Sequence, residues 1–252
     1  MGLHDIRGQW CFLSGAADGL GNAIARELAA RGMNLVLFDV QEGKVASLAH
    51  ELLALGIQAL PVGADLADAA GTQTAVAEAV RQVGPPRALI HDAAVLTPRP
   101  FREWTFEGWR RELDIILQGA FVLAKGVWEP MIAQGHGSIV FISSGSALRG
   151  FPLESAYTPA KHGQEGLMKV LSIEGAEFNI AVNTATTGAP IDTPMSWGHY
   201  TPEMRERMIS PSRLAPAFAY LAALDAEQAT GLRFDAFQVS EAISLRTEAA
   251  RA

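Results

Sequence analysis

The sequence predicts a doubly wound α/β fold, in which a parallel sheet is covered by helices on both faces. Short apolar runs alternate along the chain with longer stretches whose apolar residues recur at helical spacing, as in successive βαβ units. The runs, such as 137–142, are continuously apolar, which is typical of strands buried on both faces. No repeat or linker divides the chain, so we expect residues 1–252 to form a single domain.

The individual elements follow in order from this pattern. The apolar run 9–14 is expected to be the first strand, and a glycine-bearing turn leads from it into a helix over 20–31. Gly32 is placed to cap that helix, because glycine readily adopts the left-handed conformation found at helix ends. The remaining elements are a strand over 34–39, a helix over 42–55, a strand over 57–63, a helix over 68–83, a strand over 87–91, a helical stretch over 104–133, a strand over 138–143, a helix over 156–177 and a strand over 180–186.

The segment 187–212 breaks the alternation, since it is rich in Pro, Thr, Met and aromatic residues and contains no clear strand. A loop of this size in a compact domain usually has a function, often as a lid over a site. We therefore predict a substrate lid at about 187–212, with a surface insertion that has no role as the alternative.

Composition argues against several classes of function. The net charge is −7 and the 20 Lys and Arg residues are scattered, so no basic face for nucleic acid is expected. The single cysteine, Cys11, excludes a disulfide within the chain and lies in an apolar run, where a small core residue is expected. No His and carboxylate residues have the spacing of metal ligands. The sequence shows neither an apolar leader nor a run of about 18 apolar residues, so we expect a cytoplasmic protein that does not span a membrane.

A glycine-rich turn joins the first strand to the first helix. Gly15, Gly19 and Gly21 let the backbone turn tightly and let a pyrophosphate approach the helix N-terminus, where free N–H groups favour negative charge. Asp39 ends the second strand, 18 residues after Gly21, where a carboxylate can accept hydrogen bonds from the adenosine ribose. A carboxylate there would repel a 2′-phosphate, so NAD(H) is predicted over NADP(H). The alternatives are a tight turn without ligand and an Asp39 that only caps the next helix.

With these motifs, the chain resembles the classical short-chain dehydrogenase/reductases over about residues 8–235. The spacing Gly-x3-Gly-x-Gly, the sequence Tyr157-x3-Lys161 and a serine, Ser144, 13 residues before the tyrosine are those of the family. The resemblance implies a Rossmann-type fold and an oxidoreductase with Ser144, Tyr157 and Lys161 as catalytic residues. It also implies contacts to the cofactor from Asp18, Leu20, Asp65, Leu66, Ala93, Tyr157, Lys161, Ile191 and Thr193.

The chemistry of alcohol oxidation needs these residue types. A proton has to leave or reach the alcohol oxygen while a hydride moves, and Tyr157 is the candidate general acid/base. Because a free tyrosine has a pKa of about 10, we expect the ammonium of Lys161 to favour the phenolate; a pKa lowered by about 3 units corresponds to about 4 kcal/mol. Ser144 is expected to bind the substrate oxygen. Pro159, inside the Tyr157–Lys161 turn, requires that the helix begin close by.

The chain departs from the family's pattern at four places. After the fourth strand, the family's usual Asn-Asn-Ala-Gly is replaced by His91-Asp92-Ala93-Ala94. The family has a helix asparagine that takes part in a water-mediated proton relay, and this chain has Ile116 at that position. The usual Pro-Gly is replaced by Thr187-Gly188, and the usual Asp-Gly-Gly by Asp235-Ala236-Phe237. The side chain of Ile116 cannot hydrogen-bond a water molecule. The proton exchanged with solvent therefore needs another route, or the enzyme is slow. These changes leave open a catalytically impaired nucleotide-binding regulator or scaffold and, with less support, an oligomeric structural protein. His91 is expected to be a satisfied core histidine, with a part in a proton relay as the alternative.

The expected substrate pocket is mostly apolar. Its candidate residues follow the fourth and fifth strands or lie in the lid: Val95, Leu96, Ser146, Leu148, Phe151, Met195, Trp197 and Tyr200. We therefore expect a hydrophobic, cyclic or aromatic secondary alcohol, a dihydrodiol, or the corresponding ketone. Apolar residues on more than one face of the stretches 104–133 and 156–177 predict a homodimer or homotetramer through these helices.

Overall fold

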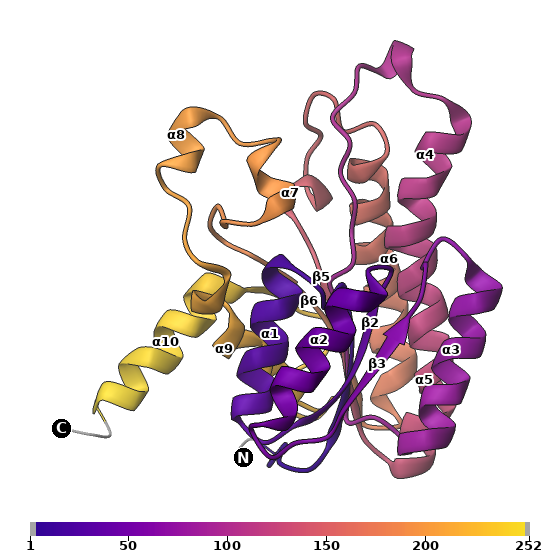
Figure 1. Cartoon of the computed structure of the whole chain (residues 1–252), viewed down its shortest axis with the longest axis vertical. Helices are drawn as coiled ribbons and strands as arrows, with labels where there is room; N and C mark the ends of the chain where they lie inside the picture. Colours follow the sequence, from indigo (N-terminus) through magenta and orange to yellow (C-terminus); the bar gives the residue numbers. More distant parts are fainter. Residues whose placement is uncertain (1–3, 250–252) are drawn as a thin grey trace.

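Seven parallel strands form one sheet in the order β3-β2-β1-β4-β5-β6-β7 (Figure 1). The computed structural model describes residues 4–249. The strands are β1 (Trp10–Ser14), β2 (Asn34–Asp39), β3 (Ala59–Gly63), β4 (Ala88–His91), β5 (Gly137–Ile142), β6 (Ile180–Thr186) and β7 (Arg233–Asp235). Every pair of neighbours is parallel, so the predicted doubly wound, Rossmann-type class is confirmed.

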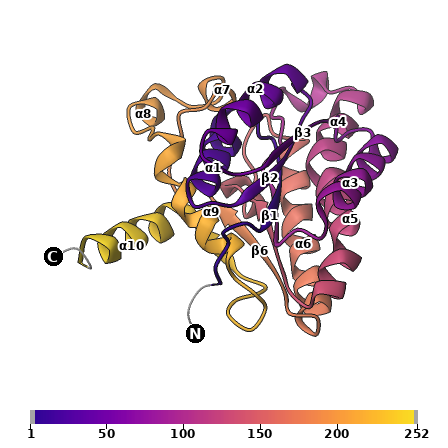
Figure 2. The ribbon, with the colours of Figure 1, turned by 60° about the horizontal axis from the view of Figure 1, so that its bottom comes forward.

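Helices cover both faces of the sheet (Figure 2). One face carries α1 (Gly19–Ala30), α2 (Glu42–Leu53) and α9 (Ala215–Ala222), and the other carries α3 (Ala69–Val83), α4 (Phe106–Leu113), α5 (Gly119–Gln134) and α6 (Tyr157–Ala176). Successive residues of β1 enter opposite halves of the core: Leu13 packs in the cluster that contains α1, and Phe12 in the cluster that contains α5. Burial on both faces explains why the strands are continuously apolar.

The strand order reverses between β1 and β4. The connections that leave these two strands run to opposite faces of the sheet, and the carboxyl ends of the strands therefore border a crevice. Gly15 follows β1 and Asp92 follows β4, and both residues lie at this crevice.

Two parts of the chain differ from the expected elements. The helical stretch expected over 104–133 is interrupted, because a π-helical turn (Asp114–Gln118) separates α4 from α5. Beyond residue 186 the structure adds α7 (Pro194–Trp197), α8 (Pro202–Arg205), α9, β7 and α10 (Ala236–Ala249). β7 has only three residues, all partly exposed, so it lacks the apolar run that marks the other strands.

By length and composition alone, the helical stretch Phe106–Gln134 is apolar enough to cross a membrane. Its inward residues, including Leu123 and Val127, are completely buried against the sheet. This is how the core helix of an α/β domain packs.

The segment 187–212 lies above the carboxyl edge of the sheet and carries two short helices, α7 (Pro194–Trp197) and α8 (Pro202–Arg205) (Figure 1). Its two ends are joined by a parallel bridge between Ile191 and Ile209. The backbone N–H of Ile209 donates to the carbonyl of Pro190 at 3.0 Å, and that of Asp192 donates to the carbonyl of Ile209 at 3.0 Å. The segment is therefore a loop closed at its base.

Candidate active site

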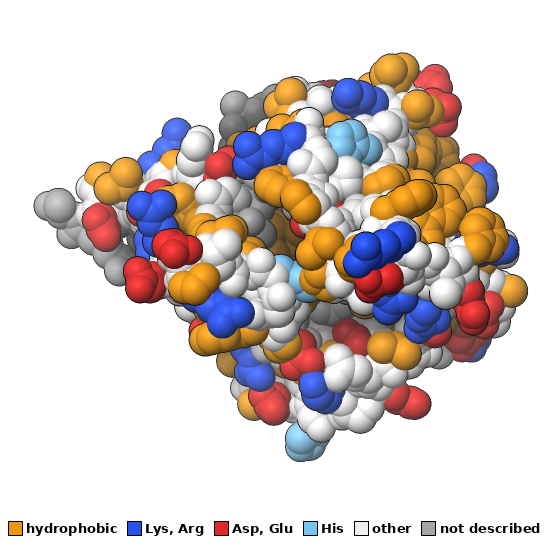
Figure 3. Space-filling view, turned by 90° about the horizontal axis from the view of Figure 1, so that it is seen from above, with side chains coloured by type: hydrophobic (Ala, Val, Ile, Leu, Met, Phe, Trp, Pro, Cys, Tyr) orange, Lys and Arg blue, Asp and Glu red, His pale blue; other side chains and the backbone are white. Residues whose placement is uncertain are grey.

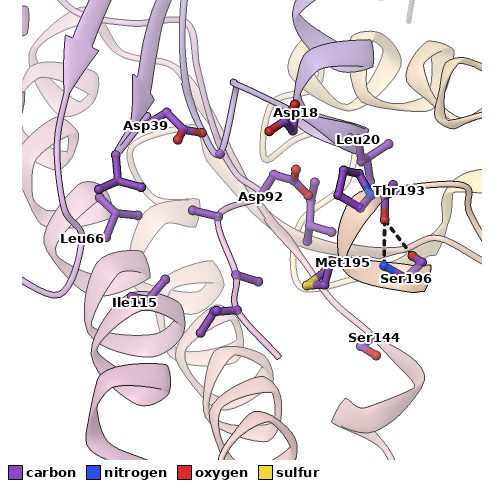
Figure 4. Close-up of a pocket in the computed structure, with 18 of the residues that line it drawn as sticks. Asp18, Leu20, Asp39, Leu66, Asp92, Ile115, Ser144, Thr193, Met195 and Ser196 are labelled. Atoms are coloured by element: carbon purple, nitrogen blue, oxygen red, sulfur yellow. Dashed lines mark hydrogen bonds between the residues drawn. The ribbon is translucent and has the colours of Figure 1, made fainter. Parts of the chain in front are cut away.

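A cleft of about 460 Å³ opens at the crevice between β1 and β4 and extends under the segment 187–212 (Figure 4). Thirteen of the sequence-predicted catalytic and cofactor residues line it: Gly15, Asp18, Gly19, Leu20, Asp39, Asp65, Leu66, Ala93, Ser144, Tyr157, Lys161, Ile191 and Thr193. Gly21 is buried behind the lining, against Gly15. Figure 4 shows Asp39 and Asp18 toward one end of the cleft and Ser144 toward the other.

The glycine turn is too tight for side chains. Gly15 has a φ of +74°, and a Cβ there would lie 2.6 Å from the backbone nitrogen of Ala93. A Cβ at Gly21 would lie 2.1 Å from the carbonyl oxygen of Gly15. Asp18, the N-cap residue of α1, makes no capping hydrogen bond with its side chain, and the N–H of Gly21 is taken by Asp92, so the N–H groups of Gly19 and Leu20 remain available to an anion. This geometry fits a pyrophosphate at the helix N-terminus.

The carboxylate of Asp39 is held beside the turn. It accepts hydrogen bonds from the backbone N–H of Ala17 at 3.0 Å and of Gln41 at 2.9 Å. The N-cap of α2 is Gln41, so the alternative reading of Asp39 as a helix cap is wrong.

The Asp18 carboxyl is paired with a lysine. Nζ of Lys44 lies 2.6 Å from Oδ2 of Asp18, and this hydrogen bond lowers the pKa of the Asp18 carboxyl.

The three expected catalytic residues meet in the cleft. Helix α6 begins at Tyr157, so Pro159 lies in its first turn, where proline is tolerated. Ser144, just after β5, lies near enough to Tyr157 to act on the pKa of its phenol, and its Oγ donates to Oγ of Ser146 at 3.3 Å. Nζ of Lys161 lies 5.5 Å from the centroid of the Tyr157 ring and donates to the carbonyl of Ile142 at 2.7 Å.

The pKa values of this group reflect its burial. Burial raises the pKa of Tyr157, and the nearby hydroxyl of Ser144 opposes that rise only in part. This direction is opposite to the lowering that was expected from Lys161, because desolvation of the phenolate outweighs the favourable contacts. Burial also lowers the pKa of Lys161 to about 8, although the negative charges of Asp92 and Glu165 act in the other direction. At neutral pH the ammonium form still predominates.

Asp92 places a carboxyl group in the middle of the cleft, between Asp39 and Ser144 (Figure 4). Burial raises its pKa to about 7, while Lys161 and the backbone N–H of Gly21 favour the carboxylate. Asp92 is therefore a titratable group at the position where the family has an asparagine.

His91 and Cys11 are core residues, as predicted. Both ring nitrogens of His91 are hydrogen-bonded, Nδ1 with Oγ of Ser14 at 2.7 Å and Nε2 with the carbonyl of Ile116 at 3.0 Å. Burial lowers the pKa of His91 to about 3, so the ring is neutral. Burial raises the pKa of the Cys11 thiol, which keeps it protonated.

The expected substrate residues are only partly gathered at the cleft. Met195 lines it, together with Val95 and Tyr200. The other five lie outside the lining: Leu96 packs near Tyr157 and Ile116, Ser146 is buried beside Ser144, and Leu148, Phe151 and Trp197 are exposed. Seen from above, exposed hydrophobic side chains gather on the side of the molecule that carries α4 (Figure 3).

Sequence reasoning missed three residues that surround the expected catalytic group. Gln164 accepts a hydrogen bond from Lys161, and Glu165 pairs with Arg233, which in turn donates to the backbone carbonyl of Ser144. Gln164 and Glu165 are three and four residues after Lys161, the spacing that brings helix side chains together, and this signal could have found them. Arg233 comes from β7, far along the chain, and has no local signal.

Comparisons with known proteins show which family the chain resembles in sequence and in fold. Residues 9–203 match the family model described as short chain dehydrogenase. The chain is 32% identical over 205 residues to a 2,3-dihydro-2,3-dihydroxybenzoate dehydrogenase of Bacillus subtilis, covering 81% of this chain and 77% of that one. It is 36% identical over 192 residues to a trans-4-hydroxycyclohexanecarboxylate dehydrogenase of Sinomonas cyclohexanicum, covering 74% and 73%. Among solved structures, a putative NAD(P)-dependent gluconate 5-dehydrogenase from Beutenbergia cavernae, with bound NADP at low occupancy, superposes with a TM-score of 0.86 at 26% identity, covering 96% of this chain and 100% of that one.

Proposed function

The chain belongs to the short-chain dehydrogenase family of oxidoreductases, and on this premise we propose that it interconverts a hydrophobic cyclic secondary alcohol or dihydrodiol and its ketone with NAD(H). The observation that carries the proposal is the meeting of Ser144, Tyr157 and Lys161 in the same cleft as the glycine turn. A scaffold that only bound nucleotide would not need these three side chains together.

Each of the three residues has a distinct task in this proposal. The phenol of Tyr157 takes the proton from the substrate hydroxyl during oxidation and returns it to the carbonyl oxygen during reduction. Ser144 donates a hydrogen bond to the same substrate oxygen and holds it near the phenol. The ammonium of Lys161 stabilises the phenolate that forms, and its low exposure strengthens this effect because little water screens the charge.

NAD(H) is the proposed cofactor, and when bound it supplies the nicotinamide ring that accepts or returns the hydride. Gly15, Gly19 and the start of α1 would hold the pyrophosphate, and Asp39 the adenosine ribose. The preference for NAD(H) rests on Asp39, whose carboxylate is fixed by two backbone N–H groups and would repel a 2′-phosphate. The residues that would contact the adenine, the nicotinamide and its ribose are Asp65, Leu66, Ala93, Lys161, Ile191 and Thr193.

The relatives support the substrate class. The names of the two curated proteins describe a dihydrodiol of a benzoate and a hydroxylated cyclohexanecarboxylate, both six-membered carbocycles with secondary hydroxyl groups and a carboxylate. The apolar Met195 and Val95 beside the catalytic group suit such a ring. The segment 187–212 is proposed to close over it.

Two measurements test this function. The purified protein is titrated with NADH and NADPH, and binding is followed by fluorescence in the wild type and in Asp39→Ala. We expect NADH to bind more tightly than NADPH, and the preference to disappear in the variant. Turnover is then measured with cyclohexanol, trans-4-hydroxycyclohexanecarboxylate and gluconate. Activity on gluconate alone would refute the proposed substrate class. NADH binding without turnover of any alcohol would favour the alternative of a catalytically impaired nucleotide-binding regulator or scaffold.

We also propose that the protein self-associates in the cytoplasm as a homodimer or homotetramer. Phe121 on α5 and Val170 and Ile173 on α6 are each more than half exposed, and a partner covering them would remove this apolar area from water. Sedimentation at micromolar concentration tests the assembly, since a monomer would contradict it.

A further inference from the structure

A continuous chain of hydrogen bonds runs from the ammonium of Lys161 into the interior and ends at Ser14. Nζ of Lys161 lies 3.0 Å from Oε1 of Gln164, and Nε2 of Gln164 lies 3.1 Å from the carbonyl oxygen of Ile116. The same oxygen lies 3.0 Å from Nε2 of His91, whose Nδ1 lies 2.7 Å from Oγ of Ser14. All five residues are buried, so water does not compete for these contacts.

The direction of every bond in this chain is fixed by chemistry. The ammonium of Lys161 can only donate, so the amide oxygen of Gln164 faces it and the amide nitrogen donates to Ile116. The carbonyl of Ile116 can only accept, so Nε2 of His91 carries the hydrogen and Nδ1 accepts from the hydroxyl of Ser14. Each donor therefore meets an acceptor. Turning over the amide of Gln164 or moving the hydrogen to Nδ1 of His91 would leave two donors or two acceptors facing each other.

A π-helical turn between α4 and α5 provides the backbone carbonyl in the middle of this chain of hydrogen bonds. Ile116 lies in the π-helical turn Asp114–Gln118, and its carbonyl accepts two bonds from side chains outside the helix. Such turns disturb the regular ladder of helix hydrogen bonds and are frequent at functional sites. Gly119 follows the turn, and a Cβ there would lie 3.2 Å from the side chain of Leu66 and in ordinary contact, at 3.5 Å, with the ring of His91.

The ammonium is thereby anchored from the side away from the cleft. Of its three N–H bonds, one reaches the carbonyl of Ile142 at 2.7 Å and a second reaches Gln164. Only the third remains for Tyr157 and the cleft. A lysine side chain has several rotatable bonds, and two fixed acceptors remove most of its freedom.

We propose that Gln164 is a positioning residue that holds the ammonium of Lys161 toward Tyr157, in place of the polar helix side chain that Ile116 does not provide. This inference rests on the proposed function, because it assigns a task to a neighbour of the proposed catalytic lysine. An amide and a carbonyl do not pass protons on, so the chain holds Lys161 without leading a proton inward. The proton of the reaction then reaches solvent through the open cleft.

The charges around Lys161 come from several elements. Asp92 after β4 and Glu165 on α6 favour the ammonium, while Tyr157 faces it from the first turn of α6 and His91 on β4 is neutral. Gln164 adds no charge but supplies an acceptor. Replacing it with Met removes the acceptor and lowers the pKa of Lys161, whereas replacing it with Glu adds a negative charge and raises that pKa.

The test measures the pKa of Lys161 directly. The chain has few lysines, so 13C-lysine NMR follows the titration of each Cε, and Lys161→Met assigns the signal. We expect Lys161 to titrate near pH 8 in the wild type, lower by about one pKa unit in Gln164→Met and higher by about one unit in Gln164→Glu. Gln118→Met is the matched control, since Gln118 donates to the carbonyl of Ala67 and does not contact Lys161.

A second readout uses the pH dependence of kcat for cyclohexanol oxidation, which should shift in opposite directions in the two Gln164 variants and stay in place in Gln118→Met. A packing role for Gln164 would not produce opposite shifts. Lys161 signals that do not move, or move in the same direction in both variants, overturn the proposal. If the signals shift as expected but the wild type turns over no alcohol, the positioning role stands and the proposed function fails.

Discussion

The guanidinium of Arg233 donates to the backbone carbonyl of Ser144 at 2.7 Å, although 89 residues separate them. Its Nε also lies 3.0 Å from the carboxylate of Glu165 on α6. One largely buried ion pair thus connects the last strand, the loop that carries Ser144 and the helix that carries Tyr157 and Lys161.

Removing this guanidinium should loosen the site. We expect Arg233→Met to leave Glu165 without its charged partner, to lower the stability by about 2–3 kcal/mol and to reduce kcat about tenfold. Arg213→Met is the control, because the Arg213–Glu241 pair is half exposed on both sides and contributes at most about 1 kcal/mol. Urea unfolding and steady-state kinetics measure both effects. Equal losses in the two variants would show that the buried pair has no special role.

Tyr157→Phe should separate chemistry from binding. The ring and its packing remain, but the group that exchanges the proton is lost, so kcat should fall by a factor of about 10²–10⁴. The affinity for NADH should change little. Tyr220→Phe, on α9 away from the cleft lining, is the matched control and should keep full activity. A Tyr157→Phe enzyme with unchanged kcat would exclude the phenol as the acid/base.

A side chain at Gly15 should clash with the backbone and prevent NADH from binding. Gly15 and Gly8 have nearly the same φ, +74° and +72°, but a Cβ at Gly15 would meet Ala93 at 2.6 Å, whereas one at Gly8 would meet nothing within 4 Å. Gly8→Ala therefore carries only the backbone strain of about 1 kcal/mol. Gly15→Ala adds a clash and should also abolish NADH binding. Thermal unfolding and fluorescence titration distinguish them, and similar NADH affinities in both variants would contradict the proposed role of the turn.

Asp92 should make stability depend on pH. Its pKa rises from an ordinary value of 3.8 to about 7 on folding, so the folded protein keeps a proton that the unfolded chain releases. The stability that Asp92 confers is therefore lost as pH rises through the window between these values, and it stays lost at higher pH.

Asp92→Asn keeps the shape and removes the titration. The variant should match the wild type near pH 4 and exceed its stability at pH 8, by about 1.4 kcal/mol for each pKa unit of the shift. Urea unfolding at the two pH values measures the difference. A difference that is independent of pH would mean that Asp92 does not titrate in this window.

The fold was predictable because its signals are local. The runs 34–39 and 180–186 match β2 and β6 residue for residue, since strands buried on both faces leave uninterrupted apolar sequence. β7 was not predictable in this way. Its three residues are partly exposed, and only pairing with β6 makes them a strand.

The residues of the site were predictable only where they belong to a local sequence motif. The glycine turn, Asp39 and the Tyr157–Lys161 pair are motifs of adjacent or helically spaced residues, and the structure brings them to one cleft. The partners Arg233 and Ile116 act through a backbone carbonyl or an ion pair with residues remote in sequence. Such contacts depend on the finished fold, so residue types and spacing alone did not reveal them.

The closed base of the segment 187–212 has a consequence for protein engineering. Because Ile191 and Ile209 bring its two ends together, the intervening residues can be exchanged as a cassette without changing the separation of the flanking chain. Chimeras that carry the corresponding loop of a relative but keep Ile191 and Thr193 should retain the sheet and the affinity for NADH while the range of accepted alcohols changes. The fold thus places Met195 and Tyr200 of the cleft lining on a replaceable segment, apart from Ser144, Tyr157 and Lys161.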